Sequence, residues 1–176
     1  FSIILFWNGI QNNTYGNFKI FEWISSGNFV ANWSINIDPL SSVMLVVVTF
    51  VSALVHIYSI GYMSHDPHKP RFMSYLSLFT FSMLVLVVSD NFLQLFFGWE
   101  GVGLCSYLLI GFWYKKESAN NAAIKAFIVN RVGDFGLAIG IFLIFFYFGT
   151  INFQQVFELV PQFIEKKLVF FGFETT

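Results

Sequence analysis

One carboxylate interrupts an otherwise uncharged and almost entirely apolar stretch. Residues 95–113 read LFFGWEGVGLCSYLLIGFW, and Glu100 lies near the middle of this run. A charged side chain in a hydrocarbon-like environment costs several kcal/mol unless something compensates it. The functional interpretation is a carboxylate that takes up and releases a proton as a cation approaches and withdraws. The alternative is a static ion pair that joins helices.

A second charged cluster lies in the segment KAFIVNRVGDFG. Arg131 and Asp134 stand three residues apart, so they share one face of a helix and can pair there. They are candidates for a proton path, and the alternative is a salt bridge that locks the helix. Lys125 stands nine residues before Asp134, near the predicted inner boundary. A lysine there can extend to water, and we favour that interpretation over a place in the proton path.

Histidines provide a weaker signal. His56 lies inside an apolar run, where it could relay protons near neutral pH, although a hydrogen-bonded packing role is the favoured interpretation. His65 and His68 flank an Asp-Pro pair, but this loop offers too few further ligands, so we expect no metal site. Tryptophans and tyrosines, Trp99 among them, are interpreted as an aromatic belt at the membrane boundaries.

The composition indicates a membrane protein. Of 176 residues, 56% are hydrophobic and only 11% are charged, whereas a soluble domain carries about 25% charged residues. The formal net charge is −1 and no basic tract is present, so nucleic-acid binding has no electrostatic basis. The single cysteine, Cys105, allows no internal disulfide. No motif for haem, an iron–sulfur cluster, a flavin or a nucleotide is recognised.

Four apolar stretches are long enough to cross a bilayer, which needs roughly 17–25 residues. The predicted fold is therefore all-α, a polytopic transmembrane helix bundle with a helix stub and a small β-hairpin. The predicted spans are residues 40–63, 72–88, 91–114 and 126–149.

The remaining segments flank this core of four helices, residues 39–149. Residues 1–10 are predicted to end a transmembrane helix, and residues 11–38 to form an outer-side loop with the hairpin. The runs NFKIFEW and FVANWSINI alternate like strands and are separated by SSGN, and Asp38-Pro39 reads as a helix start. Residues 150–176 are predicted to be an interfacial amphipathic segment followed by the start of a further helix.

Loop charges predict the orientation. Lys69 and Arg71 lie in one loop, and Lys115 and Lys116 lie in another that alternation of the helices places on the same side. Cationic loops face the cytoplasm or its mitochondrial equivalent, the matrix. The hairpin is therefore expected on the outer side.

Two segments of the sequence are similar to a known family. They are residues 56–113, HIYSIGYMSHDPHKPRFMSYLSLFTFSMLVLVVSDNFLQLFFGWEGVGLCSYLLIGFW, and residues 122–136, AAIKAFIVNRVGDFG. They resemble the chain 5 family of NADH–ubiquinone oxidoreductase, respiratory complex I, over residues 38 to 149. The membrane subunits of multisubunit cation/proton antiporters and of related hydrogenases are similar. A bias towards Phe, Ile and Asn is typical of A/T-rich organellar genes, so the mitochondrial inner membrane is the expected location, with the bacterial plasma membrane as the alternative.

The resemblance implies a proton-translocating subunit of the membrane arm. Glu100 matches the family's glutamate on its fifth helix, and Arg131 and Asp134 match its sixth-helix motif. It further implies that this chain binds no cofactor and has no redox site of its own, because NADH, FMN, iron–sulfur clusters and ubiquinone belong to other subunits. The implied partners are other membrane-arm subunits and lipids.

The sequence departs from the family pattern in one respect. The family pairs its glutamate with a lysine on the next helix, and that lysine is not found here. We therefore expect Glu100 to take its cation from outside these residues, from a chain carrying the C-terminal half. Two alternatives stay open: a subunit of an independent cation/proton antiporter, and a scaffold fragment of a split subunit.

Overall fold

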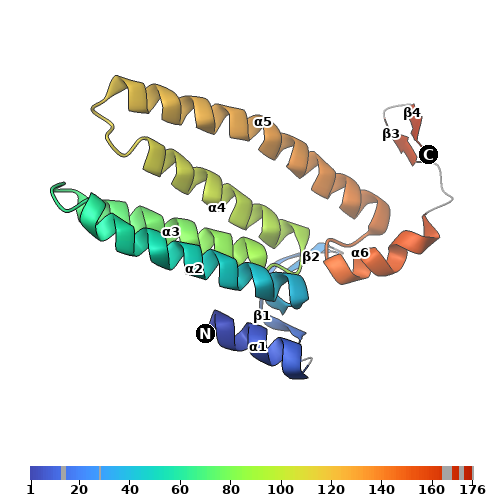
Figure 1. The fold of residues 1–176 in the computed structure, drawn as a ribbon. Coiled ribbons are helices and arrows are strands. Elements are labelled where there is room, and N and C mark those ends of the chain that lie inside the picture. Colours follow the sequence, from blue (N-terminus) through green and yellow to red (C-terminus); the bar gives the residue numbers. More distant parts are fainter. Residues whose placement is uncertain (13–14, 28, 164–167, 171–172, 176) are drawn as a thin grey trace.

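Four long helices run side by side in the computed structural model, which describes residues 1–12, 15–27, 29–163, 168–170 and 173–175 (Figure 1). A short helix and a hairpin precede them, and a short helical segment and a second small strand pair follow. The elements are α1 (Ser2–Asn12), β1 (Gly16–Ser26), β2 (Phe29–Ile37), α2 (Pro39–Tyr62), α3 (Lys69–Val87), α4 (Phe92–Ile110), α5 (Glu117–Phe148), α6 (Phe153–Leu159), the 3-10 turn η1 (Val160–Gln162), β3 (Leu168–Phe170) and β4 (Phe173–Thr175).

Helices α2 to α5 are the four described helices that are long and apolar enough to cross a membrane. The predicted fold class is thereby confirmed, although three helix boundaries differ from the prediction by three residues or more. Helix α3 begins at Lys69, so Lys69 and Arg71, which were predicted in a loop, lie in its first turn. Helix α4 ends at Ile110 because Gly111 caps it, and the residues up to 114 form turns. Helix α5 begins earlier, at Glu117, where an acidic side chain in the first turn complements the helix dipole.

The start of α2 follows from its sequence. The Asp38 side chain accepts a hydrogen bond from the Ser41 backbone N–H, and the Ser41 hydroxyl accepts one from the Asp38 N–H. This reciprocal pair satisfies two backbone donors that the first turn otherwise leaves without partners. Pro39 fits the first helical position because it has no N–H to satisfy.

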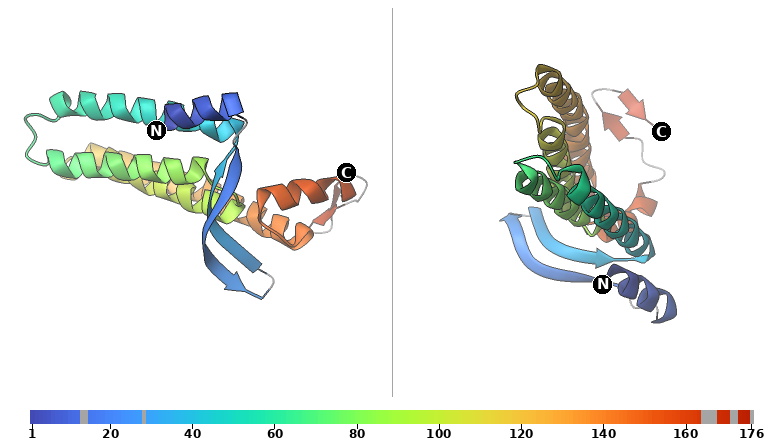
Figure 2. Two further views of the ribbon diagram at one scale, coloured as in Figure 1. Left: turned by 90° about the horizontal axis from the view of Figure 1, so that it is seen from below. Right: turned by 60° about the vertical axis from the view of Figure 1, so that its left-hand side comes forward.

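The predicted hairpin is present as the antiparallel pair β1–β2, and it crosses one end of the bundle (Figure 2). Its turn contains Gly27, whose φ of 57° is a conformation that glycine adopts at little cost. The hairpin is held to α4 by Gln94, whose side-chain amide accepts from the Ser34 backbone N–H (3.0 Å) and donates to the Ser34 carbonyl (2.8 Å). Asn17 also donates to Asp90, just before α4, at 3.0 Å.

The opposite end of the bundle joins the two cationic loops. The Trp113 indole N–H donates to Asp66 at 3.0 Å, and Arg71 donates to the Phe112 carbonyl at 3.0 Å. The indole bond, followed by the backbone N–H of His68, lowers the pKa of Asp66. Both loops thus lie at one end and the hairpin at the other, as predicted. The compartment that each end faces stays a prediction.

The first and last described segments of the chain do not form membrane-spanning helices in the structure. Helix α1 has 11 residues and packs against α2, and its continuation into a membrane span stays a prediction. The expected start of a further helix falls partly on residues 164–167, 171–172 and 176, which lie outside the described residues. In the part that is described, β3 and β4 pair antiparallel. Short runs of Val and Phe do not distinguish a strand from an apolar helix, so that expectation rested on an ambiguous signal. The interfacial position of α6 stays a prediction.

Gly98 allows α4 to lie directly against α3. A Cβ atom at this position would come within 2.8 Å of the Leu86 Cα, whereas a Cβ at Gly103 of the same helix would meet nothing within 4 Å. Gly98→Ala should therefore destabilise the protein by about 1–3 kcal/mol through overpacking. Gly103→Ala should be neutral or stabilising, because Ala is the better helix former. Thermal melting of the detergent-solubilised protein measures both, and equal melting temperatures for the two variants would contradict this packing.

Candidate functional site

Glu100 lies at mid-depth in the bundle. It is the ninth residue of the 19-residue helix α4, about 12 Å along the axis from the first residue. Arg131 and Asp134 lie near the middle of the 32-residue helix α5, which packs beside α4. The structure therefore brings together the three charged residues that the sequence analysis selected.

One guanidinium serves two carboxylates. Arg131 Nη1 donates to Glu100 Oε2, and the same nitrogen lies 3.7 Å from Asp134 Oδ2. The first contact is a hydrogen-bonded ion pair between helices, and the second is the predicted pairing along α5 at a distance too long for a direct hydrogen bond. The side chain of Asp134 is 10% exposed, that of Glu100 22% and that of Arg131 44%.

This geometry corrects the expectation that the cation beside Glu100 comes from outside these residues. In the structure that cation is Arg131, on α5 of the same chain. From the sequence, Arg131 is paired only with Asp134, because spacing along one helix identifies partners on that helix and not on its neighbour. The contact between α4 and α5 supplies the pairing that the spacing does not show.

Glu100 and Arg131 also line a cavity of about 320 Å³. Its remaining walls come from α3 and α4 and are mostly apolar, with Ser82 as a polar exception. Gly101 faces Ser82, since a Cβ at Gly101 would lie 2.6 Å from the Ser82 Oγ. The carboxylate is thus neither enclosed by its ion pair nor sealed by its helix neighbours, and a water molecule or another side chain could reach it from this cavity.

Trp99 belongs to the same site, although its sequence context predicts a place in an aromatic belt. Its indole Nε1–H donates to Asp134 Oδ1 at 2.8 Å. Its position was the available signal: an indole N–H at mid-membrane needs an acceptor, and Trp99 directly precedes Glu100, which is half-buried. The belt interpretation is therefore wrong for this residue.

His56 and Lys125 lie apart from this cluster. His56 Nδ1 lies 2.7 Å from the Ser52 carbonyl oxygen, and its Nε2 lies 3.2 Å from the Ser77 hydroxyl. The first contact lies within α2 and the second joins α2 to α3, and both agree with the packing interpretation favoured from the sequence. Lys125 is exposed on α5, six residues and about 9 Å before Arg131. A role for either residue in proton movement stays a prediction.

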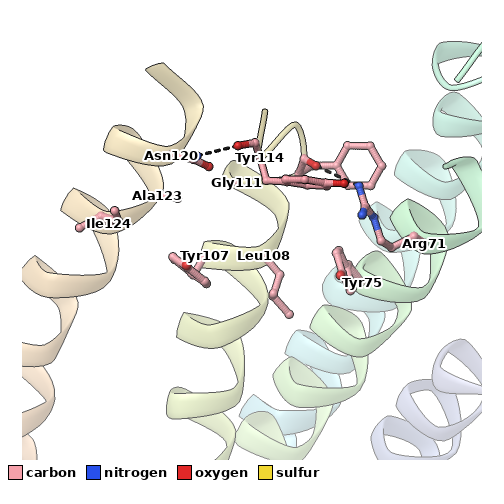
Figure 3. A pocket seen from close by; sticks show the side chains of 10 residues that line it. Arg71, Tyr75, Tyr107, Leu108, Gly111, Tyr114, Asn120, Ala123 and Ile124 are labelled. Carbon is pink, nitrogen blue, oxygen red and sulfur yellow. Dashed lines mark hydrogen bonds between the residues drawn. The ribbon is translucent and has the colours of Figure 1, made fainter. Parts of the chain in front are cut away.

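A separate cavity, of about 370 Å³, lies at the cationic end of the bundle (Figure 3). Arg71 approaches it from α3, Tyr107 from α4, and Asn120 and Ile124 from α5. The mid-membrane residues Glu100, Arg131 and Asp134 do not line this cavity. Among the residues that the structure describes, no three His, Cys, Asp or Glu side chains gather closely enough to hold a metal ion.

Two family models match the chain. The model for the N-terminus of chain 5 of NADH-ubiquinone oxidoreductase (complex I) covers residues 23–73. The model for the transmembrane region of NADH:quinone oxidoreductase and the Mrp antiporter covers residues 89–175. The second match contains the Glu100, Arg131 and Asp134 cluster together with Trp99.

Curated relatives of the chain carry the same family names, chain 5 or subunit L. The chain is 57% identical to NADH-ubiquinone oxidoreductase chain 5 of Chondrus crispus over 99% of its length, which is 26% of that relative. It is 56% identical to NADH-quinone oxidoreductase subunit L of Rickettsia bellii over 99% of its length and 27% of the relative. For chain 5 of Triticum aestivum the identity is 59% over 89% of this chain and 23% of the relative. The chain spans about a quarter of the length of these relatives. It belongs to the family of antiporter-like membrane subunits named chain 5 or subunit L of NADH:quinone oxidoreductase, complex I.

Proposed function

We propose that this chain forms part of a proton-translocating membrane subunit of NADH:ubiquinone oxidoreductase. It moves protons through charged residues at mid-membrane, coupled to electron transfer on other subunits. The observation that carries the proposal is the cluster in which Arg131 of α5 is shared between Glu100 of α4 and Asp134. An ion pair that only joined helices could be replaced by apolar side chains of similar volume without loss of stability.

The cluster allows a reversible exchange of partners. Arginine keeps its proton at all accessible pH values, so the carboxylates are the groups that can take up or release one. When Glu100 is ionised, Arg131 pairs with it; when Glu100 binds a proton, the attraction falls and Asp134 becomes the better partner. The guanidinium needs to move by only about 1 Å, from 3.7 Å to hydrogen-bond distance, to complete that exchange.

The exposure of Arg131 indicates that further protein covers this face. Its side chain is 44% exposed although it lies in the middle of a candidate span. A charge facing lipid at that depth is costly, and such residues usually face the interior of a bundle or an aqueous cavity. The curated relatives are about four times longer than this chain. The protein that covers the Arg131 face is therefore assigned to the region of the subunit that corresponds to the remaining length of those relatives. Other membrane-arm subunits are expected to pack outside that region.

The proposed membership of complex I also assigns the cofactors, the membrane and the lipid contacts. NADH, FMN, iron–sulfur clusters and ubiquinone bind to other subunits, and this chain holds no redox cofactor. The membrane is the mitochondrial inner membrane or the bacterial plasma membrane, because relatives are named from both eukaryotes and bacteria. Lipids contact the apolar outer faces of α2 and α5, where residues such as Phe50 and Phe142 are exposed.

A cation/proton antiporter subunit is the second candidate, because one matching family model also includes the Mrp antiporter. The discriminating observation is coupling. A complex I subunit copurifies with quinone-reducing NADH oxidation, and its proton movement stops when NADH is withheld. An antiporter subunit exchanges cations for protons without NADH.

Glu100→Gln should abolish most proton translocation while the complex still assembles. Glutamine keeps the shape and can accept from Arg131, but it cannot carry a proton. The measurement is the number of protons moved per NADH oxidised in sealed vesicles, with assembly followed on native gels. Glu158→Gln, at an exposed carboxylate on α6, is the matched control and should leave both unchanged. Failed assembly of Glu100→Gln alone would support the scaffold alternative.

Asp134→Asn should reduce proton translocation less than Glu100→Gln does. Arg131 then keeps its nearer partner, Glu100, and asparagine can still accept from the Trp99 indole. We expect a loss of roughly two- to threefold in protons moved per NADH, measured in the same vesicles. Losses equal to those of Glu100→Gln, or larger, would refute this ranking.

A further inference from the structure

We propose that Trp99 is a positioning residue of the proton path, which holds Asp134 so that Arg131 can alternate between two carboxylates. This proposal rests on the proton-translocating function above and adds a residue that acts through Asp134. Its basis is the bond from Trp99 Nε1 to Asp134 Oδ1 at 2.8 Å, next to the Arg131–Glu100 ion pair.

Two consecutive residues of α4 reach the same turn of α5. Glu100 bonds Arg131 and Trp99 bonds Asp134, and the two α5 residues stand three positions apart on the same helix face. The two contacts therefore link α4 to α5 side by side: Glu100 holds Arg131, and Trp99 holds Asp134. Oδ1 of Asp134 is used by the indole, and Oδ2 is the oxygen that faces Arg131 at 3.7 Å.

The chemistry of the indole suits this role. It donates one hydrogen bond and accepts none, and it does not ionise in the accessible pH range. Trp99 can therefore orient the Asp134 carboxylate without taking part in proton transfer. A fixed carboxylate with one oxygen free keeps a second acceptor within reach of Arg131, so that release of the guanidinium from Glu100 costs less. Without the indole bond, Asp134 can rotate and occupy Arg131 permanently.

Packing alone does not account for this tryptophan. The residue is 50% exposed in this chain, so only part of the ring contacts neighbours, whereas its N–H is aimed at a carboxylate that is 10% exposed. The chain also contains a second indole–aspartate bond, from Trp113 to Asp66 at 3.0 Å, which lies in the loops and away from the mid-membrane charges. That pair provides a matched control for loss of an indole N–H.

The test uses the assembled complex in sealed vesicles with Trp99→Phe, Trp113→Phe, Asp134→Asn and the double variant Trp99→Phe/Asp134→Asn. Trp99→Phe should lower the protons moved per NADH by roughly twofold, while Trp113→Phe leaves them unchanged. Because Trp99 acts through Asp134, the double variant should lose no more than Asp134→Asn alone. Additive losses, or no effect of Trp99→Phe, would overturn the proposal.

Two further measurements separate positioning from structural support. In infrared spectra, the carboxylate band that disappears in Asp134→Asn should shift in Trp99→Phe and not in Trp113→Phe; an unshifted band overturns the proposal. If Trp99→Phe does not assemble, a benzothienyl analogue of tryptophan at position 99 keeps the ring shape and removes only the N–H. It should reproduce the twofold loss, and unchanged pumping overturns the proposal. Glu100→Gln tests the underlying function separately: if that variant pumps normally, the proposed function fails, whatever Trp99 does.

Discussion

The requirement that a charge at mid-membrane must have a partner determines how α4 and α5 meet. Glu100 and Arg131 come from helices separated by a loop, and each is tolerated because the other neutralises it. Asp134 extends the pair to a cluster of three and leaves a net negative charge if both carboxylates are ionised. Two carboxylates therefore share one guanidinium at this depth, and the geometry gives Arg131 a choice of partners.

The position of Glu100 along the membrane normal depends on how α4 is fastened. At the hairpin end, Gln94 pairs with the backbone of Ser34, so an amide side chain takes the place of a neighbouring strand. In the next turn, Gly98 brings α4 against the backbone of α3. These contacts use polar and small residues where an apolar bundle in lipid gains little from larger side chains.

Much of this arrangement is contained in the sequence. Apolar run lengths predict the four spans, alternation predicts the hairpin, and the scarcity of charges within the spans selects Glu100, Arg131 and Asp134. The contacts between helices are not contained in spacing along one helix. The Glu100–Arg131 pair and the Trp99–Asp134 bond depend on the rotation of α4 relative to α5, which packing sets. The short apolar run around β3 could not be distinguished from a helix for a different reason, because strand and helix residues overlap in such runs.

The double attachment of Gln94 has a mechanical consequence. It lies six residues, about 9 Å, from Glu100 on the same helix, and its two bonds resist both sliding and rotation of α4. At the other end, the Phe112 carbonyl just beyond α4 is bonded to Arg71 of α3. Helix α4 is thus anchored at both ends, so any displacement that the proposed proton movement requires is expected in side chains or in α5, which carries Arg131.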